Sequence, residues 1–149
     1  MRTLLIAAAL LAAGPATALS CLRPDPLASF DMAAQSELPY LVLSGRITPI
    51  GAPPAEDQAG AYAARLTGEG LAYEGLTVPF DETVTLDLQC NGPWCGVPPG
   101  DDPVLVFARV DGERPLIELD PCSTWVFPAP DRQTEEALAQ CLTDGACSP

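Results

Sequence analysis

The chain has 149 residues, the length of one ordinary domain. Its 20 acidic residues oppose seven basic ones, all arginine, and it has no histidine, so the net charge is −13. The lack of histidine excludes Ser-His and Cys-His catalytic pairs and HExxH zinc sites. The negative charge argues against nucleic-acid binding, because recognition of a phosphate backbone needs a basic patch.

The first 20 residues predict a secretory signal peptide. Arg2 supplies a positive start, residues 4–13 form an unbroken apolar run, and a Gly-Pro pair then precedes several small residues. The run is too short for a permanent membrane anchor. Cleavage fits after Ala18 or after Ser20. The second site would make Cys21 the first mature residue, and a lipoprotein anchored at Cys21 is the minor alternative.

The mature part is predicted to be a single exported domain at 21–149. Loss of Arg2 takes the net charge from −13 to −14. No later stretch is apolar enough to cross a membrane. We therefore expect an acidic protein of the periplasm or the external medium.

The cysteines all lie in this mature part and predict disulfides. An even number of cysteines in an exported chain is typical of a disulfide framework, and six of them allow 15 pairings. A zinc site would favour Cys-x2-Cys pairs or histidine, whereas two spacings here are x4 and x5. We therefore expect three disulfides and no metal. The cysteines are Cys21, Cys90, Cys95, Cys122, Cys141 and Cys147.

Hydrophobic periodicity predicts helices near both ends of the mature chain and strands between them. Residues 26–36 have helical spacing, and Asp131 is a suitable N-cap for a second helix at 134–142 that ends before Gly145. Runs rich in Val, Leu and Ile predict the strands. The predicted strands are 40–50, with Gly45 at a bulge or bend, 61–67, 83–89, 104–110, 116–119 and 123–127. Loops are expected at 51–60 and 91–102.

This pattern predicts an all-β domain with flanking helices. A five-stranded OB-like barrel suits the length and removes exposed strand edges. The apolar faces of the central strands should meet in one core. These faces are Leu41 and Leu43, then Val84, Leu86 and Leu88, then Val104 and Val106.

The order of these features resembles the netrin-module family, which includes the amino-terminal domain of the tissue inhibitors of metalloproteinases. The matching features are Cys21 at the mature start, a short helix, an apolar strand at 41–47, the Tyr73-Glu74-Gly75 turn, Cys95-Gly96 before a strand at 104–108, Cys122 after a hairpin, and a C-terminal helix. The resemblance implies an OB-type barrel in which Cys21 is bridged into the Cys90–Cys95 loop and Cys122 takes the other cysteine of that loop. The short spacing of Cys141 and Cys147 predicts the third bridge.

The resemblance also implies an alternative function. In these inhibitors the α-amine and carbonyl of the first cysteine clasp the zinc of a target protease, so a free Cys21 could act in this way with Leu22 entering the protease cleft. Two features depart from the family. The second cysteine of the Cys-x-Cys start is missing, and Glu74 replaces the basic residue of the turn.

The remaining polar and aromatic motifs have ordinary structural interpretations. The acidic pairs Asp101-Asp102, Asp111-x-Glu113 and Glu118-x-Asp120 are expected on solvated turns and strand faces. Trp94 and Trp125 could form a ligand platform, although both lie near cysteines and packing in the core is favoured.

We therefore predict a non-enzymatic binding domain with no cofactor. Its expected partner is another protein, and an extracytoplasmic protease is the alternative. Cys21, Leu22 and Trp94 are the candidate binding residues.

Overall fold

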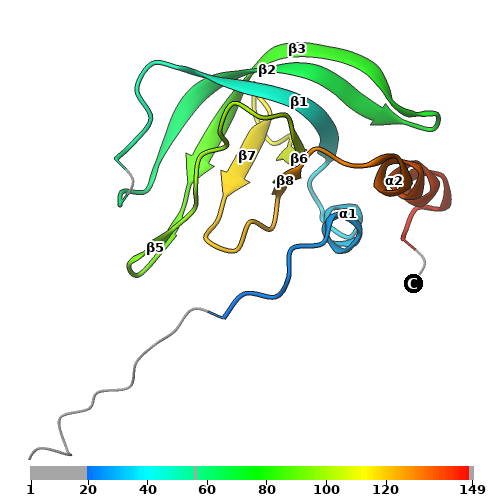
Figure 1. Cartoon of the computed structure of the whole chain (residues 1–149), viewed down its shortest axis with the longest axis horizontal. Helices are drawn as coiled ribbons and strands as arrows, with labels where there is room; N and C mark the ends of the chain where they lie inside the picture. The colour runs from blue at the N-terminus through cyan, green and yellow to red at the C-terminus, as the bar shows by residue number, and fades with distance from the viewer. Residues whose placement is uncertain (1–19, 56, 148–149) are drawn as a thin grey trace, which may run out of the picture.

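The computed structural model describes residues 20–55 and 57–147. The predicted signal peptide lies outside the described residues except for Ser20. The domain is mostly β-sheet, with one helix before the strands and one after them (Figure 1). The elements are α1 (Pro26–Ala34), β1 (Tyr40–Ile50), β2 (Gly60–Ala72), β3 (Gly75–Leu88), β4 (Cys90–Asn91), β5 (Trp94–Cys95), β6 (Val104–Arg109), β7 (Leu116–Leu119), β8 (Val126–Pro128) and α2 (Arg132–Asp144).

The strands form a six-stranded sheet and a small β4–β5 hairpin. In the large sheet β1 pairs with both β2 and β6, and β3 pairs with β2 on one side and, in parallel, with β7 on the other. A single residue pair, Arg109↔Leu116, joins β6 to β7. The pairings therefore lead from β1 through β2, β3, β7 and β6 back to β1, and β8 extends β6.

The β2–β3 hairpin is longer than the sequence pattern predicts. The sequence pattern predicts strands only at 61–67 and 83–89, whereas β2 and β3 continue to a turn at Tyr73 and Glu74. Pairing across the hairpin holds the intervening residues in strands, although Gly, Glu and Pro interrupt the alternating pattern there. The extra length carries the hairpin beyond the rest of the sheet toward α2 (Figure 1).

Two glycines let β1 and β2 approach each other closely. A Cβ atom on Gly45 would overlap the Thr67 carbonyl oxygen, and one on Gly68 would overlap the Ser44 carbonyl oxygen. The register runs through Gly45↔Gly68 in sequence order, so of the two predicted features at Gly45, a bulge or a bend, the bulge is absent. Gly45 is needed here for close backbone approach.

The buried side chains form two clusters on opposite faces of the sheet. The first cluster lies among β1, β2, β3, β6 and β7. It contains Leu43, Ile47, Tyr62, Ala64, Leu66, Val84, Leu86, Leu88, Val106, Ala108, Ile117 and Leu119, with Val104 packed against it. The second cluster joins the sheet to the helices and contains Phe30, Leu105, Phe107, Phe127, Leu138 and Cys141.

The predicted common core is confirmed except for one residue. Leu41 is 38% exposed and belongs to neither cluster. It shares a strand face with Leu43 but lies nearer the start of β1, where β2 no longer pairs with that strand.

Both helices begin after an aspartate N-cap, of which Asp131 was predicted and Asp25 was not. The Asp25 carboxylate accepts a hydrogen bond of 2.9 Å from the Leu27 N–H, and Asp131 accepts one of 2.8 Å from the Thr134 N–H. α2 ends at Gly145, which adopts the left-handed conformation (φ 79°). The Cys147 N–H donates to the Asp31 carboxylate at 2.7 Å, so the segment after α2 is held against α1.

The cysteines form three disulfides, but only one of the three predicted pairings is correct. The structure joins Cys141 to Cys147 as expected. Cys90 and Cys95 pair with each other, which leaves Cys21 to bond with Cys122, 101 positions away. The cross-strand pair Cys90↔Cys95 brings those two cysteines together within one hairpin, so neither is available to Cys21. Three disulfides fit an oxidising, extracytoplasmic compartment.

Candidate functional site

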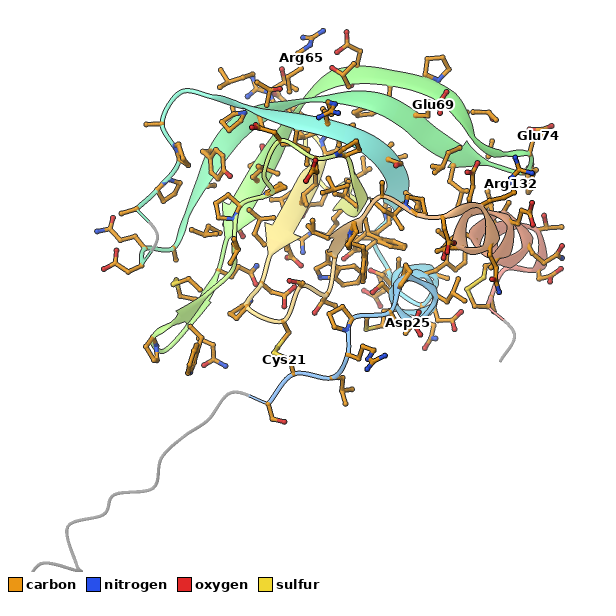
Figure 2. The ribbon with its side chains drawn as sticks, viewed as in Figure 1. Cys21, Asp25, Arg65, Glu69, Glu74 and Arg132 are labelled. Carbon is orange, nitrogen blue, oxygen red and sulfur yellow. A yellow bond between two sulfur atoms is a disulfide. The ribbon has the colours of Figure 1, made fainter. Side chains whose placement is uncertain are left out.

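The three residues predicted to bind a partner lie on the surface. Cys21 is exposed and tied to Cys122 just after β7, and Leu22 is 91% exposed (Figure 2). Trp94 is on the separate β4–β5 hairpin and is 51% exposed, so its predicted packing is wrong. No disulfide or strand pairing joins Trp94 to the described residues at Cys21 and Leu22.

The bond to Cys122 bears on both alternatives for Cys21. A sulfur atom in a disulfide cannot also carry a thioether-linked lipid, so this bond is incompatible with the lipoprotein alternative. The protease-inhibitor alternative expected Cys21 to be held against the Cys95-Gly96 loop. The disulfide implied for that arrangement is absent, because Cys95 is bonded to Cys90 and Cys21 to Cys122.

Several of the acidic residues have structural partners. Arg109 forms ion pairs of 2.8 Å with both Asp111 and Glu118. The Asp120 carboxylate accepts hydrogen bonds of 2.8 Å from the backbone N–H groups of Cys122 and Thr124. Asp101, Asp102 and Glu113 are exposed, as expected. Within 20–55 and 57–147, no group of three or more Cys, Asp or Glu residues is arranged to hold a metal ion.

Trp125 packs in the core as predicted. It stacks on Tyr40, which lines a neighbouring groove. Its ring stacks on Tyr40 at a centroid distance of 5.1 Å and lies 6.2 Å from the Phe107 ring. Burial, followed by the nearby Glu118 carboxylate, raises the pKa of Tyr40 above its ordinary value of 10.0. The phenol of Tyr40 is therefore uncharged at neutral pH.

An apolar groove of about 460 Å³ adjoins Tyr40. Its walls come from α1, the start of β1, the far end of the β2–β3 hairpin and the end of α2, and these segments lie on one side of the molecule (Figure 1). The lining residues are Phe30, Ala33, Ala34, Pro39, Tyr40, Leu41, Val42, Leu43, Gly70, Leu71, Val78, Phe80, Leu142 and Gly145. Apart from the phenol of Tyr40, no polar side chain appears among these described residues.

The groove exists because β1 and β2 separate. The β1–β2 pairing reaches Leu43↔Gly70 and stops, and the β2–β3 register shifts at Gly70/Leu71. The far end of the hairpin therefore diverges from the start of β1. Leu41 lines the resulting gap, and Val78, on the hairpin, is 52% exposed.

Negative charge lies beside the groove at the ends of both helices. Exposed Asp144 directly precedes the lining residue Gly145, whereas Glu69, next to Gly70, directs its side chain to the other face of β2. The last residue of α1 lines the groove, as does the glycine that ends α2, and neither helix has a basic residue in its last turn. The carbonyl end of a helix carries partial negative charge. Figure 2 shows Glu69 and Glu74 on the hairpin that overhangs α2, with Arg132 on that helix below them in the view.

Sequence reasoning missed this groove. Its residues come from four segments, and the hairpin segment at 68–80 was not predicted as strand. The closely spaced Gly68 and Gly70 were the available signal, because glycines within a strand often mark a bulge or a close backbone approach.

No protein-family model, curated protein or solved structure matches this chain. The resemblance to the netrin module therefore stays a prediction. Among the described residues, no helix is long and apolar enough to cross a membrane.

Proposed function

We propose that this chain is an exported, non-enzymatic domain that binds another protein, in the periplasm or outside the cell. The observation that carries the proposal is the apolar groove between the helices and the separated strands. Its walls offer hydrophobic surface for burial. Among the described lining residues they present no carboxylate, thiol or basic group for acid–base or nucleophilic chemistry.

We also propose that the sheet is an OB-like barrel. The strand pairings that return to β1 support this, as does the parallel β3–β7 pair within an otherwise antiparallel arrangement. Three disulfides would keep such a small domain folded outside the cytoplasm. A signal peptide at 1–20 would deliver it there.

Site-specific photo-crosslinking in the producing cell tests the binding function. A photoreactive phenylalanine analogue would replace Leu22, Leu41, Val78, Trp94 or Ile50, one at a time. These positions sample exposed apolar residues on different parts of the molecule. We expect an adduct with one defined protein at Leu41 and Val78, followed by a stoichiometric complex of the two purified proteins. If none of the five positions gives a protein adduct, the proposed function is wrong.

A further inference from the structure

We propose that the groove binds an extended, cationic peptide segment of the partner, which adds a short β-strand to the open edge of β1 at Tyr40–Val42. The inference rests on the proposed function and identifies its site and the chemistry of its partner. It depends on three observations: an open strand edge, an apolar lining and an acidic surround.

The strand edge is open because, among the described residues, β1 has a strand neighbour on only one side at its start. Tyr40, Leu41 and Val42 pair with Arg109, Ala108 and Phe107 of β6. On the other side, the β1–β2 register of the described residues ends at Leu43↔Gly70. About 10 Å of strand is therefore left without a second neighbour.

The direction of the backbone groups follows from one hydrogen bond. The Val110 N–H donates to the Pro39 carbonyl at 2.8 Å, and Pro39 and Val110 continue the β1–β6 register by one position. Because hydrogen-bonded and non-hydrogen-bonded pairs alternate in an antiparallel ladder, Leu41 and Leu43 direct their N–H groups toward β6. Tyr40 and Val42 direct theirs toward the open side.

The open edge lies inside the apolar groove, since Tyr40, Leu41 and Val42 all line it. A peptide in this position would gain main-chain hydrogen bonds from β1. It would also bury alternate side chains against residues such as Leu71 and Val78. This combination is the one used in recognition by strand addition. A fatty acyl chain could fill apolar space but would leave the backbone donors of Tyr40 and Val42 unused.

The negative charge near the groove indicates which residues should flank the apolar part of the peptide. After the predicted cleavage the chain carries −14, and exposed Asp144 directly precedes the lining residue Gly145. The ends of both helices add partial negative charge there. Arginine or lysine residues on either side of a short apolar segment would match this surround.

A fluorescein-labelled peptide of alternating Val and Thr, with two arginines at each end, is the probe. Binding to the purified, disulfide-bonded mature domain is followed by fluorescence anisotropy. We expect saturable binding that weakens between about 50 and about 300 mM salt, because charge interactions on the exposed rim are screened. A peptide with aspartates at its ends should bind much more weakly.

The matched variants are Leu41→Asp and Ile50→Asp. Both residues are exposed and lie on β1, but Ile50 is at the far end and does not line the groove. Leu41→Asp should weaken binding by about ten-fold or more, because a carboxylate in the groove would be desolvated by the peptide. Ile50→Asp should leave binding unchanged. Both variants add the same negative charge, so net charge cannot explain a difference. Val78→Asp replaces Leu41→Asp if the latter does not fold.

Amide hydrogen exchange tests the strand addition itself. In the free domain the Tyr40 and Val42 amides should exchange faster than those of Leu41 and Leu43, and the peptide should slow them. A probe peptide methylated on alternate backbone nitrogens, in the register that faces β1, should lose binding.

Two results would overturn the inference. One is equal peptide affinity of Leu41→Asp and Ile50→Asp, with unchanged exchange at Tyr40 and Val42. The other is failure of the peptide to bind while a dansylated C11 fatty acid binds wild type but not Leu41→Asp, which would make the groove a lipid site. If a protein partner then crosslinks only at Trp94 or Leu22, the proposed function stands and this site assignment alone is wrong.

Discussion

The carboxylate of Glu135 on α2 accepts a hydrogen bond of 2.9 Å from the backbone N–H of Leu76, which is 59 positions earlier in the chain. Leu76 is the second residue of β3, one position beyond the Gly75 that follows the turn. A Cβ atom on the preceding Gly75 would lie only 2.6 Å from the same Glu135 oxygen, and Gly75 has a φ of +111°. This bond therefore fixes the end of the hairpin to α2, and with it the wall of the groove.

Glu135→Ala should lower the free energy of unfolding by about 1–2 kcal/mol, because it leaves the N–H of buried Leu76 without its acceptor. Glu135→Gln keeps an acceptor oxygen and should cost less. Glu136→Ala is the matched control, since Glu136 is exposed on the same helix. Denaturant unfolding measures the stabilities, and hydrogen exchange should show faster exchange of the Leu76 amide. Equal stability of the Glu135→Ala and Glu136→Ala variants would show that the contact does not hold the hairpin.

Val106→Asp tests the core of the sheet. Val106 is fully buried in the cluster with Leu43, its register partner on β1. An unpaired carboxylate there should cost about 3 kcal/mol or more and lower Tm by roughly 10 °C. Ile50→Asp, at an exposed site, should melt close to wild type. A Val106→Asp variant that melts within a few degrees of wild type would show that β6 is not central.

Peptide mapping without reduction tests the disulfides. We expect bonds between Cys21 and Cys122, between Cys90 and Cys95, and between Cys141 and Cys147. A bond from Cys21 to Cys90 or Cys95 would instead restore the pairing implied by the family resemblance.

The same bonds should differ in their contribution to stability. In the chain-entropy model the Cys21–Cys122 bond, closing a separation of 101, contributes about 4.7 kcal/mol. The Cys90–Cys95 bond, with a separation of 5, contributes roughly 2 kcal/mol. Replacing both cysteines of a pair by serine should therefore destabilise the protein more for the long loop. Denaturant unfolding measures the two losses. A larger loss for the Cys90–Cys95 replacement would contradict the chain-entropy model.

The sequence predicts much of the fold because its strongest signals are local. Alternation in Val84, Leu86 and Leu88 identifies the buried face of β3, and all three are at most 1% exposed. Asp131 and Gly145 mark the ends of α2. These features depend on residues a few positions apart, so periodicity and capping preferences are enough to find them.

The candidate site could not be predicted in the same way. Leu41 has the pattern of a core residue, and it becomes exposed because β2 leaves β1 at Gly70. The groove then depends on where a distant hairpin and two helices meet. The pairing of Cys21 with Cys122 is also a consequence of tertiary arrangement, since spacing alone does not distinguish it from the alternatives.

We expect no inhibition of zinc proteases when purified protein that begins at Cys21 is titrated against several zinc endopeptidases. Clasping a catalytic zinc would require a free, rigidly positioned amine at Cys21. Cys21 is tethered by its side chain to Cys122, but the adjoining Leu22 is 91% exposed and has no second cysteine beside it to restrain it. Ordering this segment on binding would cost roughly 1–2 kcal/mol per residue.

A matched variant with one alanine added before Cys21 makes this test decisive. The addition displaces the amine and leaves Cys21 free to bond with Cys122, so Tm should change little. Because we expect no inhibition by the native terminus, the two proteins should be equally inactive in the titration. Pro24 further limits adjustment of this segment inside a protease cleft, since its ring fixes its own φ and restricts Arg23 before it. Stoichiometric inhibition by the native terminus that is lost on the alanine extension would establish the inhibitor function and overturn our expectation.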